Sequence, residues 1–205
     1  MKIPAVEADV LRFAYSTPPR DRMRPAIFLD RDGILNERIV GGYITAWEQF
    51  RWVPGIIDAL VELAAIGLPL IVISNQAAVN KGILAPSVLA GITEQFVQCL
   101  ASEGVRIDAV YYCPHTPDQA CGCRKPQGGL LRLAAKQWRL DLRNSTLIGD
   151  SLSDAEAAQA AGCRAVLLDR FGDLNKGTGW GVTVNTLAEV VEYVRRSAAE
   201  GDRWT

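Results

Sequence analysis

The sequence predicts an α/β protein in which a central parallel sheet lies between two layers of helices, a Rossmann-like three-layer arrangement. From Pro25 onward, short apolar runs alternate with segments of helical periodicity, which is the pattern of strands joined by crossover helices. The apolar runs do not alternate with polar residues, so they fit strands that are covered on both faces. With 205 residues, of which 49% are hydrophobic, the chain can bury one substantial core, and this composition excludes a disordered protein.

Turn and capping residues place the elements along the chain. Pro54 and Gly67 bracket the first helix, and Pro86 opens the second. The segment from Ser153 to Glu156 has the form of a capping box that begins the fourth helix. The expected strands are residues 26–30, 70–73, 107–112, 146–149 and 165–168. The expected helices are residues 54–66, 86–101, 129–138, 153–161 and 186–198.

The sequence divides into a short N-terminal segment and one long domain. Residues 1–24 show no clear periodicity, and we expect them to form an N-terminal extension or an edge strand. Residues 25–205 are expected to form one domain that includes a cysteine-rich loop at 113–123. The chain is therefore expected to be one domain with an appendage.

Charge and cysteine content exclude several classes of protein. Lysine and arginine number 22 against 23 aspartates and glutamates, so no basic surplus argues for binding to nucleic acid or an anionic membrane. The longest run without polar side chains, residues 63–73, is too short for a membrane span, which needs roughly 20 apolar residues. Glu7 and Asp9 interrupt the pattern of a signal peptide. The five cysteines argue against a disulfide framework and for a reducing compartment, so we expect a cytoplasmic protein.

Reactive side chains follow the expected strands at the points where these strands end. Asp30 and Asp32 follow the first strand, Ser74 follows the second, a cysteine-rich loop follows the third, and Asp150 follows the fourth. Ligands bind outside the carboxyl ends of the strands in sheets of this kind. This coincidence predicts one functional site at a single edge of the sheet.

Three carboxylates at one edge predict a divalent cation. Asp30, Asp32 and Asp150 would repel one another at low dielectric, and an oxygen-rich site of this type suits Mg²⁺, which often also binds substrate phosphate. Lys125 would supply the opposite charge, either as a phosphate ligand or as the counter-ion of a nucleophile. Ser74 and the amide side chains that follow it can hydrogen-bond phosphoryl oxygens.

The cysteine-rich loop predicts a second metal. Three thiols and the chain's one histidine lie within eleven positions, at Cys113, His115, Cys121 and Cys123. This is the Cys₃His set of a closed structural Zn²⁺ site, which leaves no position for a catalytic water. Arg124 directly follows the last ligand, so zinc would fix the loop that presents the neighbouring cations.

Four segments together resemble the motifs of the haloacid dehalogenase-like phosphatases. They read Phe-Leu-Asp-Arg-Asp-Gly at 28–33, Ser-Asn-Gln at 74–76, Cys-Arg-Lys-Pro at 123–126 and Gly-Asp-x-x-x-Asp at 149–154. The cysteine loop narrows the resemblance to the group that holds the D-glycero-D-manno-heptose 1,7-bisphosphate phosphatases and the histidinol-phosphate phosphatases. No long insertion separates the motifs, so no large cap domain is expected.

The resemblance implies catalytic and metal-binding roles. Asp30 would be the nucleophile that forms an aspartyl-phosphate, and Asp32 would act as general acid and then as base. Mg²⁺ would be held by the Asp30 carboxylate, the Asp32 backbone carbonyl and Asp150. The family's strand order would place the strands that carry Asp30 and Asp150 side by side, so that both carboxylates could share one ion.

The resemblance also implies which residues bind the substrate. Ser74 and Lys125 would bind the transferring phosphoryl group, while Asn75 and Arg124 would contact the remainder of the substrate. An open site would accept a small phosphorylated sugar, and members of the group are typically monomeric.

Two regions bear on the choice of substrate. The segments around Tyr43 and Lys81 resemble those of the heptose enzymes. The short loop between His115 and Cys121 resembles that of the histidinol-phosphate phosphatases, and Ser151 stands where heptose enzymes often carry lysine. We therefore expect hydrolysis of the C7 phosphate of the heptose 1,7-bisphosphate, with histidinol phosphate as the alternative.

Two other classes fit fewer of the residues. A receiver-type signalling domain also places acids and a lysine at one sheet edge, but it needs neither the cysteine loop nor a second acid two residues after the first. A zinc-containing binding module without activity would not need all four motifs. Turnover of a phosphate ester separates an enzyme from both classes.

Overall fold

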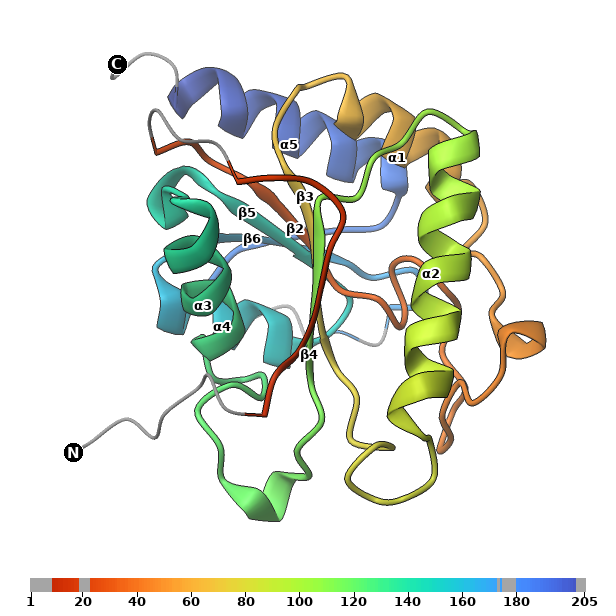
Figure 1. Cartoon of the computed structure of the whole chain (residues 1–205). Coiled ribbons are helices and arrows are strands. Elements are labelled where there is room, and N and C mark those ends of the chain that lie inside the picture. Colours follow the sequence, from red (N-terminus) through yellow and green to blue (C-terminus); the bar gives the residue numbers. More distant parts are fainter. Residues whose placement is uncertain (1–8, 19–22, 173, 175–179, 202–205) are drawn as a thin grey trace.

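Seven strands form one twisted sheet in the computed structural model, which describes residues 9–18, 23–172, 174 and 180–201. The spatial order of the strands is β1-β4-β3-β2-β5-β6-β7 (Figure 1). All neighbours pair in parallel except β1, which is antiparallel to β4. The strands are β1 (Leu11–Ala14), β2 (Ile27–Leu29), β3 (Leu70–Asn75), β4 (Ala109–Cys113), β5 (Thr146–Gly149), β6 (Arg164–Leu168) and β7 (Val182–Val184).

Helices cover both faces of this sheet (Figure 1). They are α1 (Ile56–Ala64), α2 (Pro86–Ser102), α3 (Gly129–Trp138), α4 (Leu152–Ala161) and α5 (Leu187–Gly201), with short 3-10 turns at Trp47–Gln49, Pro117–Gln119 and Leu142–Asn144. One core packs α1, α2 and α5 against one face of the strands, and a second core packs α3 and α4 against the other. The three-layer arrangement expected from the sequence is confirmed.

The five expected strands and five expected helices are all present, with ends that differ by a few residues. Two further strands are present: β1 realises the edge-strand alternative expected for residues 1–24, and β7 was not expected. In β1, Leu11 and Phe13 face the core while the intervening residues face outward, so this short edge strand gives only a weak alternating pattern. Strand β7 has three residues, two of them exposed, and it shows no apolar run.

The start of α4 corrects one expectation. The helix is capped by Ser151, whose backbone N–H and hydroxyl both donate to the Asp154 carboxylate at 3.2 and 2.5 Å. The expected box from Ser153 to Glu156 is therefore wrong by two residues. The sequence holds the Ser-x-x-acid pattern twice in this segment, and only the first copy stands at the end of β5, where the chain turns into the helix.

The strand order places the functional residues. From β2 the chain proceeds outward through β3 and β4, and it then returns to the other side of β2 as β5. The carboxyl ends of β2 and β5 therefore lie side by side at the point where the order reverses, which is where ligands bind in such sheets. Asp30 and Asp150 directly follow these two strands.

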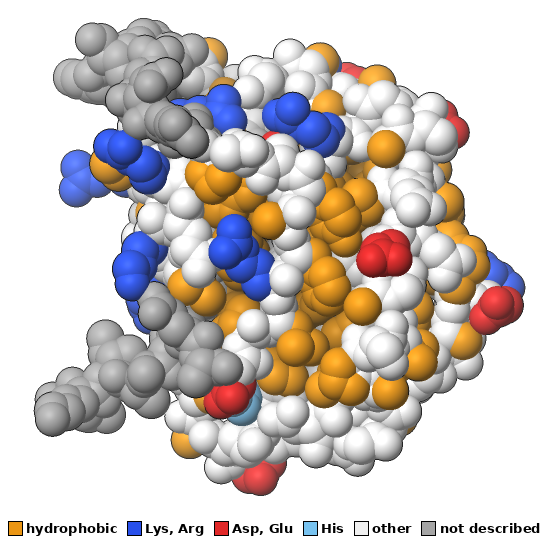
Figure 2. Space-filling model, viewed as in Figure 1, with side chains coloured by type: hydrophobic (Ala, Val, Ile, Leu, Met, Phe, Trp, Pro, Cys, Tyr) orange, Lys and Arg blue, Asp and Glu red, His pale blue; other side chains and the backbone are white. Residues whose placement is uncertain are grey.

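One face of the molecule exposes both apolar and polar side chains. Apolar side chains are visible among polar ones on the face that Figure 2 shows, and the one histidine is partly exposed there beside an acidic group. An exposed acid is close to His115: the Asp9 carboxylate lies 3.6 Å from Nε2 of the imidazole. Among the described residues, no helix is both long enough and apolar enough to cross a membrane.

Candidate active site

Two glycines bring the acidic side chains together. Gly33 has φ of +101°, and a Cβ atom there would lie 1.7 Å from a carboxylate oxygen of Asp150. At Gly149, a Cβ atom would lie 2.4 Å from Cβ of Asp154. The side chains of Asp150 and Asp154 thus occupy the space that these glycines leave free. As a result, carboxylate oxygens of Asp30, Asp150 and Asp154 lie within 4.8 Å of one another.

Asp30 is buried next to a lysine. Its side chain is 8% exposed, and one carboxylate oxygen lies 2.8 Å from Nζ of Lys125. The same ammonium group lies 2.5 Å from Asp154. Burial raises the pKa of Asp30 to about 7; Lys125 opposes this shift, while Asp154 and Asp150 add to it. Burial and the two neighbouring carboxylates therefore work against the ionised form of Asp30, and Lys125 favours it.

Lys125 carries a firmly held positive charge. Burial works against the charged form, but the carboxylates of Asp154 and Asp30 outweigh it and hold the pKa of Lys125 well above its ordinary value. The backbone of Lys125 is fixed by Asn75, whose side-chain amide both donates to and accepts from it, at 3.0 Å each. Asn75 was expected to contact the substrate; in the structure its side chain positions Lys125.

Asp32 lies in a different electrostatic setting from Asp30. Its side chain is 26% exposed and is bound by Arg31, with Nη2 at 2.9 and 3.0 Å from the two oxygens. Asn36 and Gln76 donate to the same carboxylate at 2.9 and 2.8 Å. Burial alone would raise the pKa of Asp32, but Arg31 and these hydrogen bonds lower it. The surroundings of the two acids of the first motif therefore shift their pKa values in opposite directions.

Ser74 lies at the end of β3 on the same edge of the sheet. Its side chain is buried, and the hydroxyl accepts a hydrogen bond of 3.1 Å from Gln76. Because Gln76 also donates to Asp32, it joins the two positions. Gln76 was not among the expected site residues, although it stands in the Ser-Asn-Gln segment.

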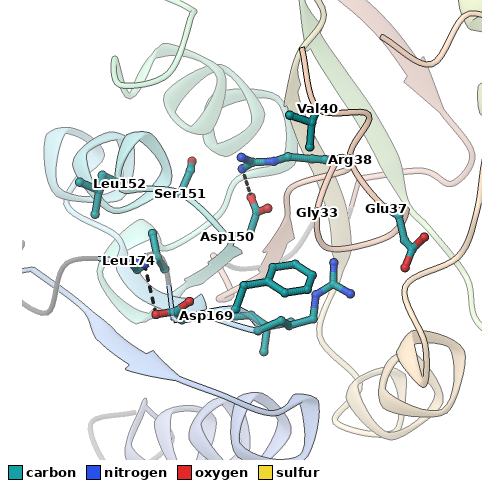
Figure 3. Close-up of a pocket in the computed structure, with 12 residues that line it drawn as sticks. Gly33, Glu37, Arg38, Val40, Asp150, Ser151, Leu152, Asp169 and Leu174 are labelled. Carbon is teal, nitrogen blue, oxygen red and sulfur yellow. Dashed lines mark hydrogen bonds and ion pairs between the residues drawn. The ribbon is translucent and has the colours of Figure 1, made fainter. Parts of the chain in front are cut away.

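Arg38 is a further residue that the sequence did not single out. Its Nη2 lies 2.5 Å from the carboxylate of Asp150, and its Nε lies 3.5 Å from the backbone carbonyl of Asp32. Figure 3 shows the guanidinium directed at Asp150 beside a cavity of about 530 Å³. The arginine lies in the loop that follows β2, and no periodicity marks its position.

Asp154 was quoted in the fourth motif but was not expected to be a site residue. It is fully buried, and its carboxylate contacts both Lys125 and Ser151. One side chain therefore caps α4 and orients the lysine. The spacing of four residues from Asp150 was the signal that could have identified it.

Three expected substrate residues lie in loops around this site. Lys81 places its ammonium group 5.4 Å from the centre of the Tyr43 ring, a favourable cation–π geometry. Arg124 donates from Nη1 to the backbone carbonyl of His115 at 3.0 Å. The structure thus pairs Tyr43 with Lys81, and it ties Arg124 to the cysteine loop instead of to the carboxylates.

The four donor atoms of the Cys/His cluster lie close together. All four lie within 4.8 Å of one another, with Sγ–Sγ contacts of 3.3, 3.4 and 3.6 Å and with Nδ1 of His115 at 3.2 Å from Cys123. The backbone N–H of Arg124 donates to the sulfur of Cys121 at 3.4 Å. The cluster therefore holds the start of the segment that carries Arg124 and Lys125.

The two clusters suit different metal ions. Three carboxylates provide only hard oxygen donors, which fit Mg²⁺. The thiols and imidazole fit a tetrahedral site, because Zn–S bonds of about 2.3 Å imply Sγ–Sγ separations of roughly 3.8 Å, close to those observed. Both sets of residues therefore have the chemistry to hold a metal ion.

Comparisons with known proteins agree with this geometry. Residues 122–172 match the HAD-hydrolase-like family model. The D-glycero-beta-D-manno-heptose-1,7-bisphosphate 7-phosphatase of Photorhabdus laumondii is 35% identical over 83% of this chain and 95% of the relative. The protein of the same name from Escherichia coli K12 is 34% identical over 84% and 94%, respectively.

A solved structure shows the same fold. The D,D-heptose 1,7-bisphosphate phosphatase from B. bronchiseptica, complexed with magnesium and phosphate, matches with a TM-score of 0.75 at 30% identity, over 85% of this chain and 99% of that chain. The motifs, the strand order and these relatives agree with one another. The chain belongs to the haloacid dehalogenase-like phosphatases, in the group of the heptose 1,7-bisphosphate phosphatases.

Proposed function

We propose that the protein is a magnesium-dependent phosphatase that removes the C7 phosphate of D-glycero-β-D-manno-heptose 1,7-bisphosphate. The observation that carries the proposal is the group formed by Asp30, Asp150, Asp154 and Lys125 at the switch point of the sheet. The names of the relatives support the substrate. The magnesium and phosphate in the B. bronchiseptica structure support the cofactor.

Asp30 is the proposed nucleophile. One carboxylate oxygen attacks phosphorus as the bond between phosphorus and the C7 oxygen breaks, which leaves an aspartyl-phosphate. Asp32 protonates the departing oxygen and later takes a proton from the water that attacks phosphorus. That attack breaks the bond to Asp30 and releases inorganic phosphate. The low pKa of Asp32 suits the second step, whereas the first step requires Asp32 in its protonated form.

The magnesium ion would be held by the carboxylates of Asp30 and Asp150 and by the backbone carbonyl of Asp32. When bound, it neutralises phosphoryl charge and favours the ionised form of the nucleophile. Lys125 and Ser74 would bind the remaining phosphoryl oxygens. Burial of Lys125 makes its charge more effective there, because the local dielectric is low.

The Cys/His cluster is proposed to hold a structural Zn²⁺ through Cys113, His115, Cys121 and Cys123. Its contribution would be to position residues 124 and 125 in an enzyme whose domain comprises residues 25–205. Arg124 is proposed to contact the substrate through the guanidinium N–H groups that its hydrogen bond to the His115 carbonyl leaves available. Tyr43 and Lys81 would contact the part of the sugar that is distant from C7.

Steady-state phosphate release in Mg²⁺ tests the proposal with three substrates: the β and α anomers of the heptose bisphosphate and histidinol phosphate. We expect kcat/KM for the β anomer to exceed that for histidinol phosphate at least tenfold, about 1.4 kcal/mol of transition-state binding. The Lys81→Gln variant should reduce this preference, while Lys136→Gln on α3 serves as the matched control. Preference for histidinol phosphate would contradict the substrate, and no turnover of any ester would contradict the enzyme.

A further inference from the structure

Arg38 occupies an unusual position for a half-exposed arginine. Its side chain is 49% exposed, yet its two contacts at the site are the Asp150 carboxylate, at 2.5 Å, and the Asp32 backbone carbonyl, at 3.5 Å. These are two of the three groups that the proposed function gives to Mg²⁺. The guanidinium group and the metal ion would therefore compete for the same oxygen atoms.

The charges at the site explain why a cation is drawn there. Asp30, Asp150 and Asp154 are close together, and the ammonium group of Lys125 contacts only the first and third of them. Asp150 receives its ion pair from Arg38 instead.

The loop that carries Arg38 allows its side chain to move without its backbone. The preceding residue, Glu37, donates from its backbone N–H to the carbonyl of Arg51 at 2.7 Å, which fixes the loop. The side chain has several rotatable bonds and lies at the margin of the cavity of about 530 Å³ that Figure 3 shows. A guanidinium that leaves Asp150 therefore has the space of this cavity beside it.

We propose that Arg38 is a built-in counter-ion that closes the magnesium site while no metal is bound and is displaced when Mg²⁺ binds, so that it sets the affinity of the enzyme for the metal. The inference rests on the proposed magnesium site. Arg38 balances the charge of Asp150 in the metal-free protein, and Mg²⁺ must break this ion pair in order to bind. Arg38 thus changes the affinity for Mg²⁺ through its ion pair with Asp150, and it is neither a metal ligand nor a catalytic residue.

Calorimetric titration of the full-length protein with MgCl₂ tests this role. The variants are Arg38→Gln, Arg38→Lys and, as a control for the loss of one charge, Arg51→Gln, which changes an exposed arginine adjacent to the same loop. Elemental analysis should first establish that all samples carry the same metal content in the cysteine cluster. We expect Arg38→Gln to lower the Kd for Mg²⁺ about five- to tenfold, where tenfold corresponds to about 1.4 kcal/mol.

Lysine should give an intermediate Kd, because a single ammonium group cannot hold both oxygen partners as a guanidinium does. Arg51→Gln should bind Mg²⁺ as the wild type does. Thermal unfolding gives a second result that does not depend on activity. Without Mg²⁺ the Arg38→Gln variant should melt below the wild type, and with saturating Mg²⁺ this difference should largely disappear.

An unchanged or higher Kd in Arg38→Gln would overturn the inference and leave the magnesium site intact. If the wild type binds no Mg²⁺, the proposed magnesium site and this inference fail together. Should Arg38→Gln be too unstable to titrate, Arg38→Lys decides the matter by the same criterion.

Discussion

The carboxylate cluster and the Cys/His cluster lie at the same edge of the sheet but are built in opposite ways. The side chains of the Cys/His cluster come from the end of β4 and the short loop that follows it, and they contact mainly one another. The carboxylates come from segments far apart in the chain, and they are paired with Lys125 and Arg38. The three carboxylates are therefore partly neutralised by two cations of the chain itself, whereas in the described part of the chain no lysine or arginine forms an ion pair within the thiol cluster. We expect metal loss to impair activity at the first site and stability at the second.

The largest effect should come from the nucleophile. Replacing Asp30 with asparagine removes the attacking oxygen but keeps the shape of the side chain, so turnover should fall by about 10⁴-fold or more. The melting temperature should not fall, because a neutral amide costs less to bury than a carboxylate. Phosphate release and thermal unfolding of the same preparation check both parts. Retained activity would contradict the assignment of Asp30 as nucleophile.

The next largest effect should come from the cysteine cluster. Cys121→Ser removes one of the ligands and the sulfur that accepts the Arg124 N–H, so the free energy of unfolding should drop by about 4 kcal/mol or more. Elemental analysis should show the loss of zinc from the variant. The control is Cys99→Ser, a partly buried cysteine in α2 outside the cluster. If the two variants melt alike and the wild type contains no zinc, the structural role is wrong.

A smaller effect should appear in the pH dependence of stability. The pKa of Asp30 is raised by burial from its ordinary value of 3.8 to about 7, so the metal-free folded protein keeps a proton that the unfolded chain loses. The free energy of unfolding should therefore fall by a few kcal/mol between about pH 4 and pH 7 and then level off. Urea unfolding without Mg²⁺, compared between wild type and Asp30→Asn, isolates this contribution. A difference that grows in favour of the wild type as pH rises would contradict it.

The sequence predicted the fold well because local patterns mark buried parallel strands and their helices. Uninterrupted apolar runs identified β2 to β6, and proline and glycine marked the helix ends. Strand β1 was expected only as an alternative to an irregular extension and β7 was missed, for a physical reason. They lie at the edges of the sheet, where only one face is covered or the strand is very short, so their residues need not be uniformly apolar.

The site was predicted in part. Residues that follow strand ends could be placed together, because the ends of parallel strands share one edge. Arg38 could not be placed in this way, since it lies in an irregular loop and meets Asp150 across 112 positions of sequence. Asp154 was overlooked because the capping pattern was assigned to the wrong serine. Contacts made by long side chains depend on the tertiary structure, which periodicity does not describe.

The two glycines at the centre of the site show that its geometry requires two positions without a side chain. Gly33 and Gly149 supply no donor, acceptor or charge, yet a single added methyl group at either would overlap an aspartate side chain. An engineer who transplants this active site into another scaffold must therefore copy two vacant positions along with the acids. A catalogue of functional groups alone would omit both of them, and the grafted carboxylates would then be held apart.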